Sequence, residues 1–367
     1  MKTVPSQEPS KPTLSEVSER AGVGRSSAAR VLGGYGSVSA YTRDRVLAAA
    51  AELGYETNEL ARSMSTGVTK TIGVIVADLA NPYFAGVLRG VSDTTRAAGY
   101  GTIVISTDED QKREDEAVRL LTAKRVDGII VAPAGGRQAD ASALRSAIER
   151  GTPLVQIDRT VDGLDADAVV LDNRDAAREA TDYLLAAGHR RIALAWGPAV
   201  PTEQASVADL ALAARTTEIT SVGERYLGYA DAFADAGVAV DPLLVMTGEQ
   251  TAEGVRDFLA GVLGTDGATA VIATEQDAVI ASLGEARARG LRIPQDLSIV
   301  SFDDSPWAEV HEPAITTVRQ PLRALGENAA NLLLARIAGE APGPTVTHLS
   351  SEFVDRASVR RVKRGGR

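Results

Sequence analysis

The N-terminal region contains a short run of polar side chains suited to reading DNA. Residues 25–30, RSSAAR, place two arginines and two serines ahead of an apolar pair, Val31 and Leu32. If this run is helical, the apolar pair forms its rear face and the polar side chains point outward. Arginine donates paired hydrogen bonds to guanine, and serine hydroxyls bind phosphate oxygens. The pattern indicates nucleic-acid recognition; a plain helical hairpin with a solvated polar face is the alternative.

The flanking sequence supplies the elements that would position this helix. Thr13 and Glu16 have the spacing of a capping box, so a first helix is expected to begin at Leu14. Gly22 tolerates a positive φ and would end that helix in a sharp turn, after which Gly24 can begin the second. Two short helices joined in this way are typical of a helix-turn-helix. The predicted buried face of the first helix contains Leu14, Val17 and Ala21. A third helix is expected from about Thr42 to Leu53, and its buried face would contain Val46, Leu47, Ala50 and Leu53.

Further along, apolar runs that read as buried strands alternate with helical stretches, several of which end in glycine. This alternation is typical of parallel sheets with helical crossovers. The predicted strands are 72–76, 102–106, 128–132 and 154–157, and then a second set at 168–171, 192–196, 243–246, 270–273 and 298–302. Two such sets predict two α/β lobes in succession. Neither contains a G-x-G-x-x-G or P-loop sequence, so nucleotide binding is not indicated.

Polar residues near the carboxyl ends of these strands are candidates for a small-molecule site, because ligands of α/β sheets bind there. Carboxylates and arginine hydrogen-bond to hydroxyls, and aromatic rings stack on a sugar face. The candidates are Asp78, Asn81, Tyr83, Phe84, Asp158, Arg159, Arg225, Glu275, Asp277 and Asp303. The alternative for each charged residue is a strand-end cap or a salt bridge between the lobes.

Length and composition limit the classes of protein that fit. The 367 residues are enough for a small domain and one or two larger ones, and 44% hydrophobic residues is ordinary for a globular protein. Cysteine is absent, which fits a reducing cytoplasm, and no apolar run has the length of a membrane span. We therefore expect a cytoplasmic protein without a membrane partner. Residues 1–12 are polar and proline-rich and lack the apolar core of a secretory signal, so they are expected to form a disordered arm.

The net charge of −10 is unevenly distributed. Residues 1–70 contain nine basic and seven acidic side chains, so the negative charge falls on the remainder. An acidic body disfavours indiscriminate binding to phosphate, while the weakly basic head can still bind DNA locally. The three histidines, at 189, 311 and 348, are too scattered for a metal centre or a nucleophile system. No metal, cofactor or enzymatic activity is therefore expected.

A family resemblance covers most of the chain. Residues 13–64, TLSEVSERAGVGRSSAARVLGGYGSVSAYTRDRVLAAAAELGYETNELARSM, resemble the headpiece of LacI/GalR-type (lactose-repressor) transcriptional regulators. The resemblance continues, in order, through IGVIVADLANPYFAGVLRG, RVDGIIVAP, VVLDN, AAGHRRIALAWGP, IPQDLSIVSFDDS and ITTVRQP, and spans roughly residues 12–355. It implies an all-α helix-turn-helix headpiece followed by an α/β twin-lobe effector domain of the periplasmic-binding-protein type (type I).

The resemblance also implies a division of the chain. The helix-turn-helix domain would span 13–57, the hinge helix and linker 58–69, the effector-binding and dimerisation domain 70–360, and a basic tail 361–367. Within the effector domain, the N-lobe would comprise about 70–165 and 320–344, and the C-lobe about 166–319 and 345–360.

For DNA, the second helix would enter the major groove. Arg25 and Ser26 are the candidates for base reading, and Arg30 for a guanine or a phosphate. Backbone phosphates would be bound by Thr13, Ser27 and Asn58. By resemblance, NELARSM folds as a hinge helix only when two copies pair in the minor groove, with Ala61 against the groove and Met64 as the apolar wedge where leucine is usual. The implied partner is palindromic double-stranded operator DNA, bound by a homodimer.

For the effector, the resemblance places Asp158, Arg225, Glu275, Asp303 and Trp307 around a small molecule, most commonly a sugar. The sequence departs from the family at Glu275–Gln276, where Asn-Asp is usual, and in a longer segment between Pro198 and Arg225. The identity of the effector therefore cannot be copied from a relative. A solute-binding protein without a DNA role and a sugar-processing enzyme are the alternative functions.

Overall fold

The computed structural model describes residues 12–55, 67–136, 139–200, 205–217, 219–247, 250–264 and 267–362. The chain divides into two compact units, residues 1–70 with 125–127, and the remainder. Most of the predicted arm, the hinge residues Asn58, Ala61 and Met64, and tail residues 363–367 lie outside the described residues.

Residues 12–55 form the headpiece. Its helices are α1 (Leu14–Ala21), α2 (Arg25–Gly33) and α3 (Ala40–Leu53). The capping box at Thr13 and Glu16 is confirmed, and Gly22 ends α1 with a φ of 60°. Val17, Ala28 and Val46 meet in the core between the three helices. The sequence therefore specifies this unit through local rules: a polar cap begins α1, and a left-handed glycine separates α1 from α2.

The third helix differs from its prediction in two respects. It begins at Ala40 rather than Thr42, because the Ser39 hydroxyl accepts a hydrogen bond from the Thr42 amide and caps the helix earlier. Leu47 is not part of the buried stripe, since it is 50% exposed, and Ala49 is buried instead. The buried positions keep the i, i+3, i+4 spacing from Val46, which rotates Leu47 off that face.

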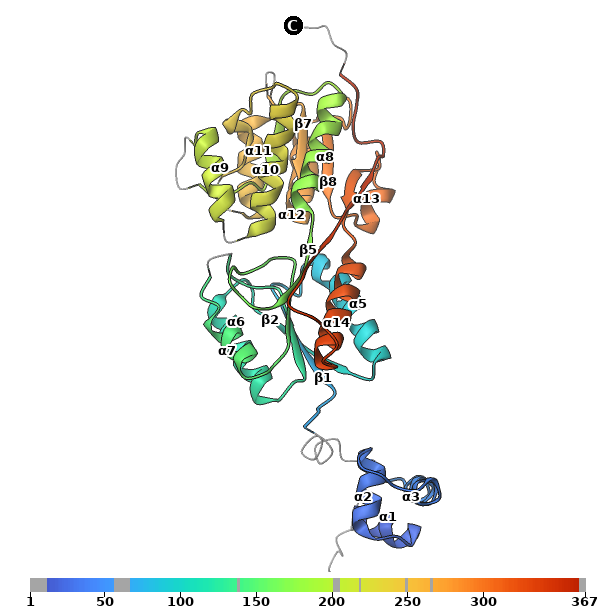
Figure 1. Cartoon of the computed structure of the whole chain (residues 1–367). Coiled ribbons are helices and arrows are strands. Elements are labelled where there is room, and N and C mark those ends of the chain that lie inside the picture. Colours follow the sequence, from blue (N-terminus) through green and yellow to red (C-terminus); the bar gives the residue numbers. More distant parts are fainter. Residues whose placement is uncertain are drawn as a thin grey trace, which may run out of the picture. The chain divides into compact units, whose positions relative to one another are not determined.

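The second unit contains two sheets with helices on both faces (Figure 1). Among the described residues, the N-lobe sheet has six strands in the order β10-β5-β4-β3-β1-β2, and the C-lobe sheet five in the order β11-β9-β8-β7-β6. The N-lobe elements are β1 (Thr71–Val76), α5 (Pro82–Ala97), β2 (Gly101–Ser106), α6 (Gln111–Ala123), β3 (Gly128–Val131), α7 (Ser142–Glu149), β4 (Leu154–Ile157), β5 (Asp167–Leu171), α14 (Leu322–Ile337) and β10 (Val346–Leu349). The C-lobe elements are α8 (Asn173–Ala186), β6 (Ile192–Ala195), α9 (Val207–Thr216), α10 (Thr220–Asp235), the 3₁₀ helix η1 (Pro242–Leu244), α11 (Ala252–Val262), β7 (Ala270–Ala273), α12 (Gln276–Ala288), β8 (Ser298–Phe302), α13 (Pro306–Val310), β9 (Thr316–Arg319) and β11 (Glu352–Val354).

Two predicted lobe boundaries differ in the structure. Residues 166–171 and the strand from 346 belong to the N-lobe and not, as predicted, to the C-lobe, because β5 and β10 pair with each other in the N-lobe sheet. The reason is a tertiary anchor: the Asp167 carboxylate accepts hydrogen bonds from Arg336 of α14 and from the Thr345 amide, which fixes the start of both strands. In the described chain, the lobes are therefore joined where β5 leads into α8, β9 into α14, and β10 into β11.

The predicted strand at 243–246 is also wrong. The run begins as η1 and makes a single isolated bridge between Val245 and Leu194. Its apolar residues Leu244 and Met246 are buried under the edge of the C-lobe sheet, which explains the apolar pattern without a strand.

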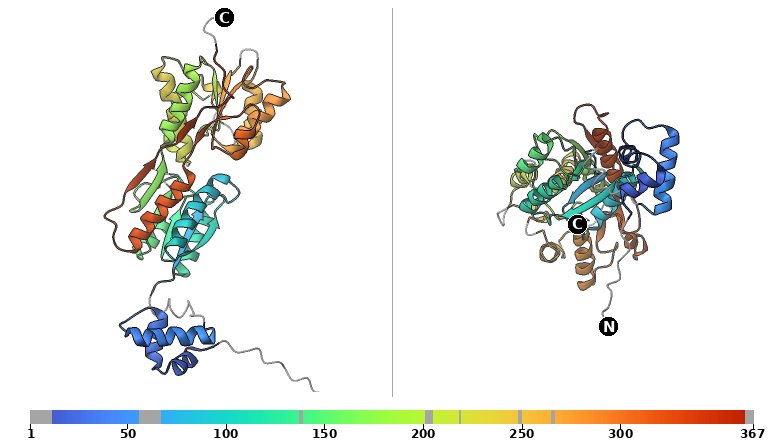
Figure 2. Two further views of the ribbon diagram at one scale, coloured as in Figure 1. Left: turned by 90° about the vertical axis from the view of Figure 1, so that its right-hand side faces the viewer. Right: turned by 90° about the horizontal axis from the view of Figure 1, so that it is seen from below.

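Close helix crossings hold each lobe together. In the N-lobe, α5 and α14 lie side by side over one face of the sheet (Figure 2). A Cβ atom at Gly326 of α14 would lie 2.0 Å from the Val87 carbonyl oxygen of α5, so only glycine permits this approach. In the C-lobe, Gly228 of α10 meets the Arg174 carbonyl oxygen of α8 in the same way.

We predict opposite effects for two glycine-to-alanine substitutions in helices. Gly326→Ala is expected to lower the free energy of unfolding by about 2–3 kcal/mol, because α5 and α14 must move apart. Gly284→Ala, in α12 with no atom near the added Cβ, is expected to raise it by about 1 kcal/mol through helix propensity. Urea denaturation of both variants checks the pair, and an unchanged stability for Gly326→Ala would contradict the tight crossing.

His189 makes the C-lobe sensitive to acid. The ring contacts the Thr269 hydroxyl at 2.8 Å and the Arg360 carbonyl oxygen at 3.2 Å, and burial lowers its pKa from 6.5 to about 4. The unfolded chain therefore takes up this proton at a higher pH than the native protein does. The corresponding stability is complete above pH 6.5 and is lost as the pH falls toward 4, by at most about 3 kcal/mol.

We predict that His189→Gln flattens the pH dependence of stability between pH 6.5 and 4 relative to the unmodified protein. Denaturation midpoints measured across this range check the prediction. Because carboxylates titrate in both proteins, parallel profiles would show that His189 is not the responsible group.

Candidate functional site

The outward face of α2 carries the predicted DNA-reading residues. Arg25, Ser26 and Arg30 are exposed and Ser27 is half-buried, while Ala28 packs into the core. The aliphatic part of Arg30 lies beside Gly36, where a Cβ atom would come within 3.3 Å of Arg30 Cδ. This contact supports the base of the side chain and leaves the guanidinium exposed.

Among the described residues, neither Arg25 nor Arg30 forms an ion pair, whereas Arg20 of α1 is paired with Glu52. The headpiece thus keeps two uncompensated cations on one helix. Thr13 is the exception among the predicted contacts, because its hydroxyl bonds to Glu16 in the capping box. A phosphate contact by the Thr13 hydroxyl would therefore compete with its hydrogen bonds to Glu16.

The second site is a cleft of about 340 Å³ between the two lobes of the second unit, large enough for a small ligand. Its N-lobe wall begins at Asn81, which caps α5 by accepting a hydrogen bond from the Tyr83 amide. The Tyr83 hydroxyl donates to Asp158 at 2.8 Å, and the Phe84 ring packs edge-on against Tyr83. These contacts orient an aromatic pair and a carboxylate along one wall.

Arg159 organises the same wall. It donates to both carboxylate oxygens of Glu109, at 2.6 and 2.8 Å, and to Asp158 at 3.3 Å. Burial alone would lower the pKa of Arg159, but the two carboxylates raise it overall, so the guanidinium stays charged.

Arg225 of α10 has the corresponding position in the C-lobe and is 4% exposed. Its guanidinium donates to Asn173 at 2.9 Å and to the Thr274 carbonyl oxygen and Glu275, both at 2.7 Å. It also lies 4.7 Å from the centre of the Phe302 ring, a cation–π distance. The arginine therefore holds Glu275 at the start of α12.

Asp158 and Asp303 are placed by the same local geometry in the two lobes. Each follows a strand, with a φ of 67° and 66° respectively, and each backbone amide donates at 3.1 Å to the next strand, at Val169 and Val318. The Asp303 carboxylate accepts a hydrogen bond from Gln320, which lies where β9 leads into α14. Asp303 thus links the cleft to a crossing between the lobes.

Burial dominates the electrostatics of the C-lobe wall. It raises the pKa of Glu275 to about 7 despite the opposing effect of Arg225, although 26% of the side chain still meets solvent in the cleft. Burial also raises the pKa of Asp303, again against Arg225. Both carboxylates are therefore held in surroundings that oppose their negative charge.

The structure brings together nine of the eleven predicted effector residues. Those lining the cleft are Asp78, Asn81, Tyr83, Phe84, Asp158, Arg159, Arg225, Glu275 and Asp303. Asp277 is exposed on α12 and Trp307 packs against the C-lobe core, with its ring near His311, so neither lines the cleft. Further lining residues that the sequence reading missed are Glu109, Trp196, Ile219, Ser221, Val222 and Gln250.

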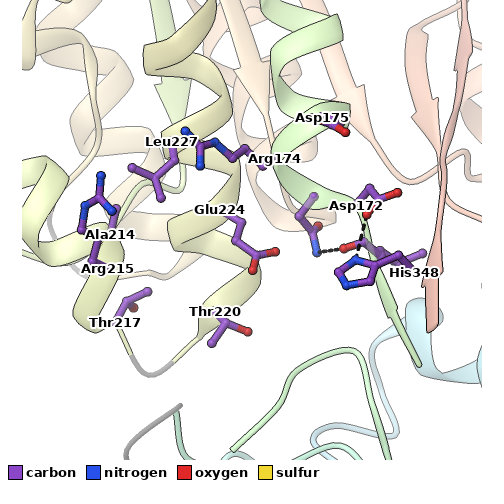
Figure 3. Close-up of a pocket in the computed structure, with 12 residues that line it drawn as sticks. Asp172, Arg174, Asp175, Ala214, Arg215, Thr217, Thr220, Glu224, Leu227 and His348 are labelled. Carbon is purple, nitrogen blue, oxygen red and sulfur yellow. Dashed lines mark hydrogen bonds and ion pairs between the residues drawn. The ribbon is translucent and has the colours of Figure 1, made fainter. Parts of the chain in front are cut away.

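A second pocket, of about 420 Å³, lies among α8, α9, α10 and β10 (Figure 3). Asp172 and His348 meet there at 2.9 Å, across two of the segments that lead between the lobes. Asn173 lines this pocket and also bonds to Arg225 of the cleft. None of the predicted effector residues, all of which the structure describes, lines it.

Comparisons with known proteins identify both units. Residues 13–58 match the model of bacterial regulatory proteins of the lacI family, and residues 69–357 match that of periplasmic binding proteins and the sugar binding domain of the LacI family. The chain belongs to the LacI family. The second match alone covers most of the chain, and the two matches follow one another in the family's order.

Several LacI-family relatives match over nearly their full length. The transcriptional regulator CelR of Thermobifida fusca is 33% identical over 95% of this chain and 98% of its own. The transcriptional repressor CytR of Escherichia coli K12 is 28% identical over 95% and 96%. Both relatives are helix-turn-helix transcriptional regulators by name, and as a member of the LacI family this chain is a DNA-binding transcriptional regulator and not an enzyme.

Solved LacI-family structures agree with the fold. A CelR–cellobiose complex has a TM-score of 0.66 at 30% identity, covering 95% of this chain and 99% of that one. The lac repressor dimer bound to operator and an anti-inducer has a TM-score of 0.76 at 25% identity, covering 96% and 100%. In the described part of this chain, no helix is both long and apolar enough to cross a bilayer.

Proposed function

We propose that this regulator is a repressor that binds a palindromic operator as a homodimer and is controlled by a sugar or sugar derivative bound between its lobes. The observation that carries the proposal is that one chain joins an exposed arginine-bearing recognition helix to a cleft rich in hydrogen-bonding groups. The two alternative functions, a solute-binding protein and a sugar-processing enzyme, would account for the cleft but not for the exposed recognition helix.

For operator binding, Arg25, Ser26 and Arg30 are the base-reading candidates on α2. Ser27, Thr13 and the hinge residue Asn58 are the candidates for phosphate contacts. Ala61 and Met64 are proposed to enter the minor groove, the methionine acting as a soft wedge at the central base step. The hinge residues lie outside the described part of the chain, so their role rests on the family resemblance.

A dimer follows from the weak charge of the head. Two uncompensated arginines on one short helix supply little electrostatic affinity, so stable binding needs a second half-site. The lac repressor relative was solved as a dimer on its operator. A two-fold dimer requires a palindromic operator, because each head reads one half-site.

For the effector, the cleft offers carboxylates and arginines for hydroxyl groups, together with Tyr83, Phe84 and Trp196 for a sugar face. The CelR relative was solved with cellobiose. Asp303 is the proposed relay, because it meets the cleft and bonds to Gln320 at a lobe crossing. Occupancy of the cleft would shift the lobes, and DNA affinity and effector affinity would then change by the same factor.

Selection of genomic fragments by the full-length protein tests the proposal. We expect enriched fragments that share a palindrome, and retention on that palindrome should change in either direction when the cognate sugar of a panel is added. The functions of the genes beside the enriched fragments would indicate which sugars to include in the panel. Fragments without a symmetric motif, or a motif whose binding no sugar alters, would contradict the proposal.

A further inference from the structure

The charge balance of the cleft indicates the charge and the hydrogen-bonding groups of its ligand. This inference rests on the function proposed above. We propose that the effector is a polyhydroxy compound that is uncharged or carries a basic nitrogen, and that the cleft rejects phosphorylated sugars. The shared chemistry of the accepted ligands is an excess of O–H or N–H donors without an anionic group.

Carboxylates outnumber cations in the cleft. Among the described residues that line it there are five carboxylates and two arginines, and neither lysine nor histidine. The carboxylates are Asp78, Glu109, Asp158, Glu275 and Asp303. The lining therefore carries three uncompensated negative charges with all groups ionised, and two with Glu275, whose pKa is about 7, protonated.

Both arginines of the cleft are already paired with carboxylates. Arg159 is held by both oxygens of Glu109 and by Asp158, at distances of 2.6 to 3.3 Å. Arg225 is held by Asn173, the Thr274 carbonyl oxygen and Glu275, within 2.9 Å. A phosphate that displaced either carboxylate from its arginine would break a buried ion pair and leave that carboxylate buried without a partner.

Several hydrogen-bond acceptors of the cleft are unused. Among the described residues, one carboxylate oxygen each of Asp78, Glu275 and Asp303 has no hydrogen-bond partner. Behind Asp303, Gln320 is 6% exposed and its amide oxygen is also without a partner in the described structure. Unsatisfied acceptors favour a ligand that donates hydrogen bonds.

Helix dipoles do not reverse this balance. The N-terminal ends of α5, α10 and α12 bring Tyr83, Ser221 and Glu275 to the cleft. Each helix end is equivalent to about half a positive charge, or about +1.5 for the three, against two or three negative charges. The field at the ligand thus remains negative, and it opposes a phosphate that carries between about one and a half and two charges.

Binding of matched sugars to the full-length protein tests the inference. The probes are glucose, glucosamine, glucose 6-phosphate, ribose, ribose 5-phosphate and cellobiose, with calorimetry as the readout. We expect binding by at least one neutral or amino sugar, and affinity at least about tenfold weaker for the matching phosphate. A phosphate that binds more tightly than its parent sugar would overturn the inference but leave a sugar effector standing. Failure of every probe to bind, with operator binding intact, would count against the sugar effector and against this inference with it.

A variant pair locates the origin of the selectivity. At about pH 8, where Glu275 is mostly ionised, Glu275→Gln removes one negative charge from the cleft, and the amide oxygen can still accept from Arg225. We expect the affinity ratio of sugar phosphate to parent sugar to rise about tenfold. Glu179→Gln, on the exposed face of α8, changes the net charge equally and should leave the ratio unchanged. Equal shifts in both variants, or none in Glu275→Gln, would show that the cleft charge does not select the ligand.

Discussion

Arg30→Ala is expected to reduce operator affinity by at least about 30-fold. A paired arginine–guanine contact contributes about 1–3 kcal/mol, and a dimer loses the contact in both half-sites. The folded headpiece should survive, because Arg30 is exposed and alanine is a good helix former. Fluorescence anisotropy with a selected operator duplex measures the loss, and circular dichroism checks the fold.

Arg20→Ala is the matched control for this substitution. It removes the same charge from the same unit, but Arg20 is already neutralised by Glu52 and lies on α1. We expect a change of only a few-fold, with the base preference of the protein retained. If the two variants bind the operator equally well, α2 is not the reading element.

Asp303→Asn is expected to abolish the effector response while leaving operator binding without sugar within about twofold. Loss of a charged hydrogen bond at a buried site costs about 1.5–3 kcal/mol, so the affinity for a bound sugar should fall by about 10–100-fold. Since burial raises the pKa of Asp303, the ionised form is disfavoured in the folded protein. The amide should therefore keep or raise the melting temperature.

The melting temperature separates a lost binding group from a damaged lobe in this experiment. Thermal shift with and without a sugar that stabilises the unmodified protein gives both readings from one sample. A normal sugar-dependent shift in Asp303→Asn would place the effector elsewhere. A large drop in the melting temperature without sugar would assign Asp303 a structural role instead.

Local rules are sufficient for much of what the sequence predicts. The capping box at Thr13 and the left-handed turn at Gly22 depend only on neighbouring residues, and both are confirmed. The rule that ligands bind beyond the carboxyl ends of strands brings Asp158 and Asp303 to one cleft, because the parallel strands β4 and β8 end at equivalent edges of the two sheets.

Tertiary contacts account for what the sequence reading missed. Glu109 joins the cleft through a bidentate pair with Arg159, fifty positions away, which no local pattern indicates. Trp196 was counted as the last residue of a strand, although the strand ends at Ala195 and the tryptophan lines the cleft. Trp307 is near Asp303 in sequence, but α13 turns it into the C-lobe core.

The boundary between the lobes also depends on contacts that local sequence patterns do not reveal. The apolar run at 168–171 fits either sheet by composition, and only the pairing of Asp167 with Arg336, 169 positions apart, assigns it to the N-lobe. Periodicity predicts that a strand exists, whereas its neighbours in the sheet depend on contacts between distant segments.

In this regulator, occupancy of the interlobe cleft is proposed to control the affinity of the recognition helix for operator DNA. The most direct test of this control is the operator affinity of the full-length protein, measured with and without a saturating sugar that binds the cleft, beside the sugar affinity with and without operator. We predict that the two affinities change by one common factor, of about fivefold or more. An operator affinity that stays the same while the cleft is filled would contradict it.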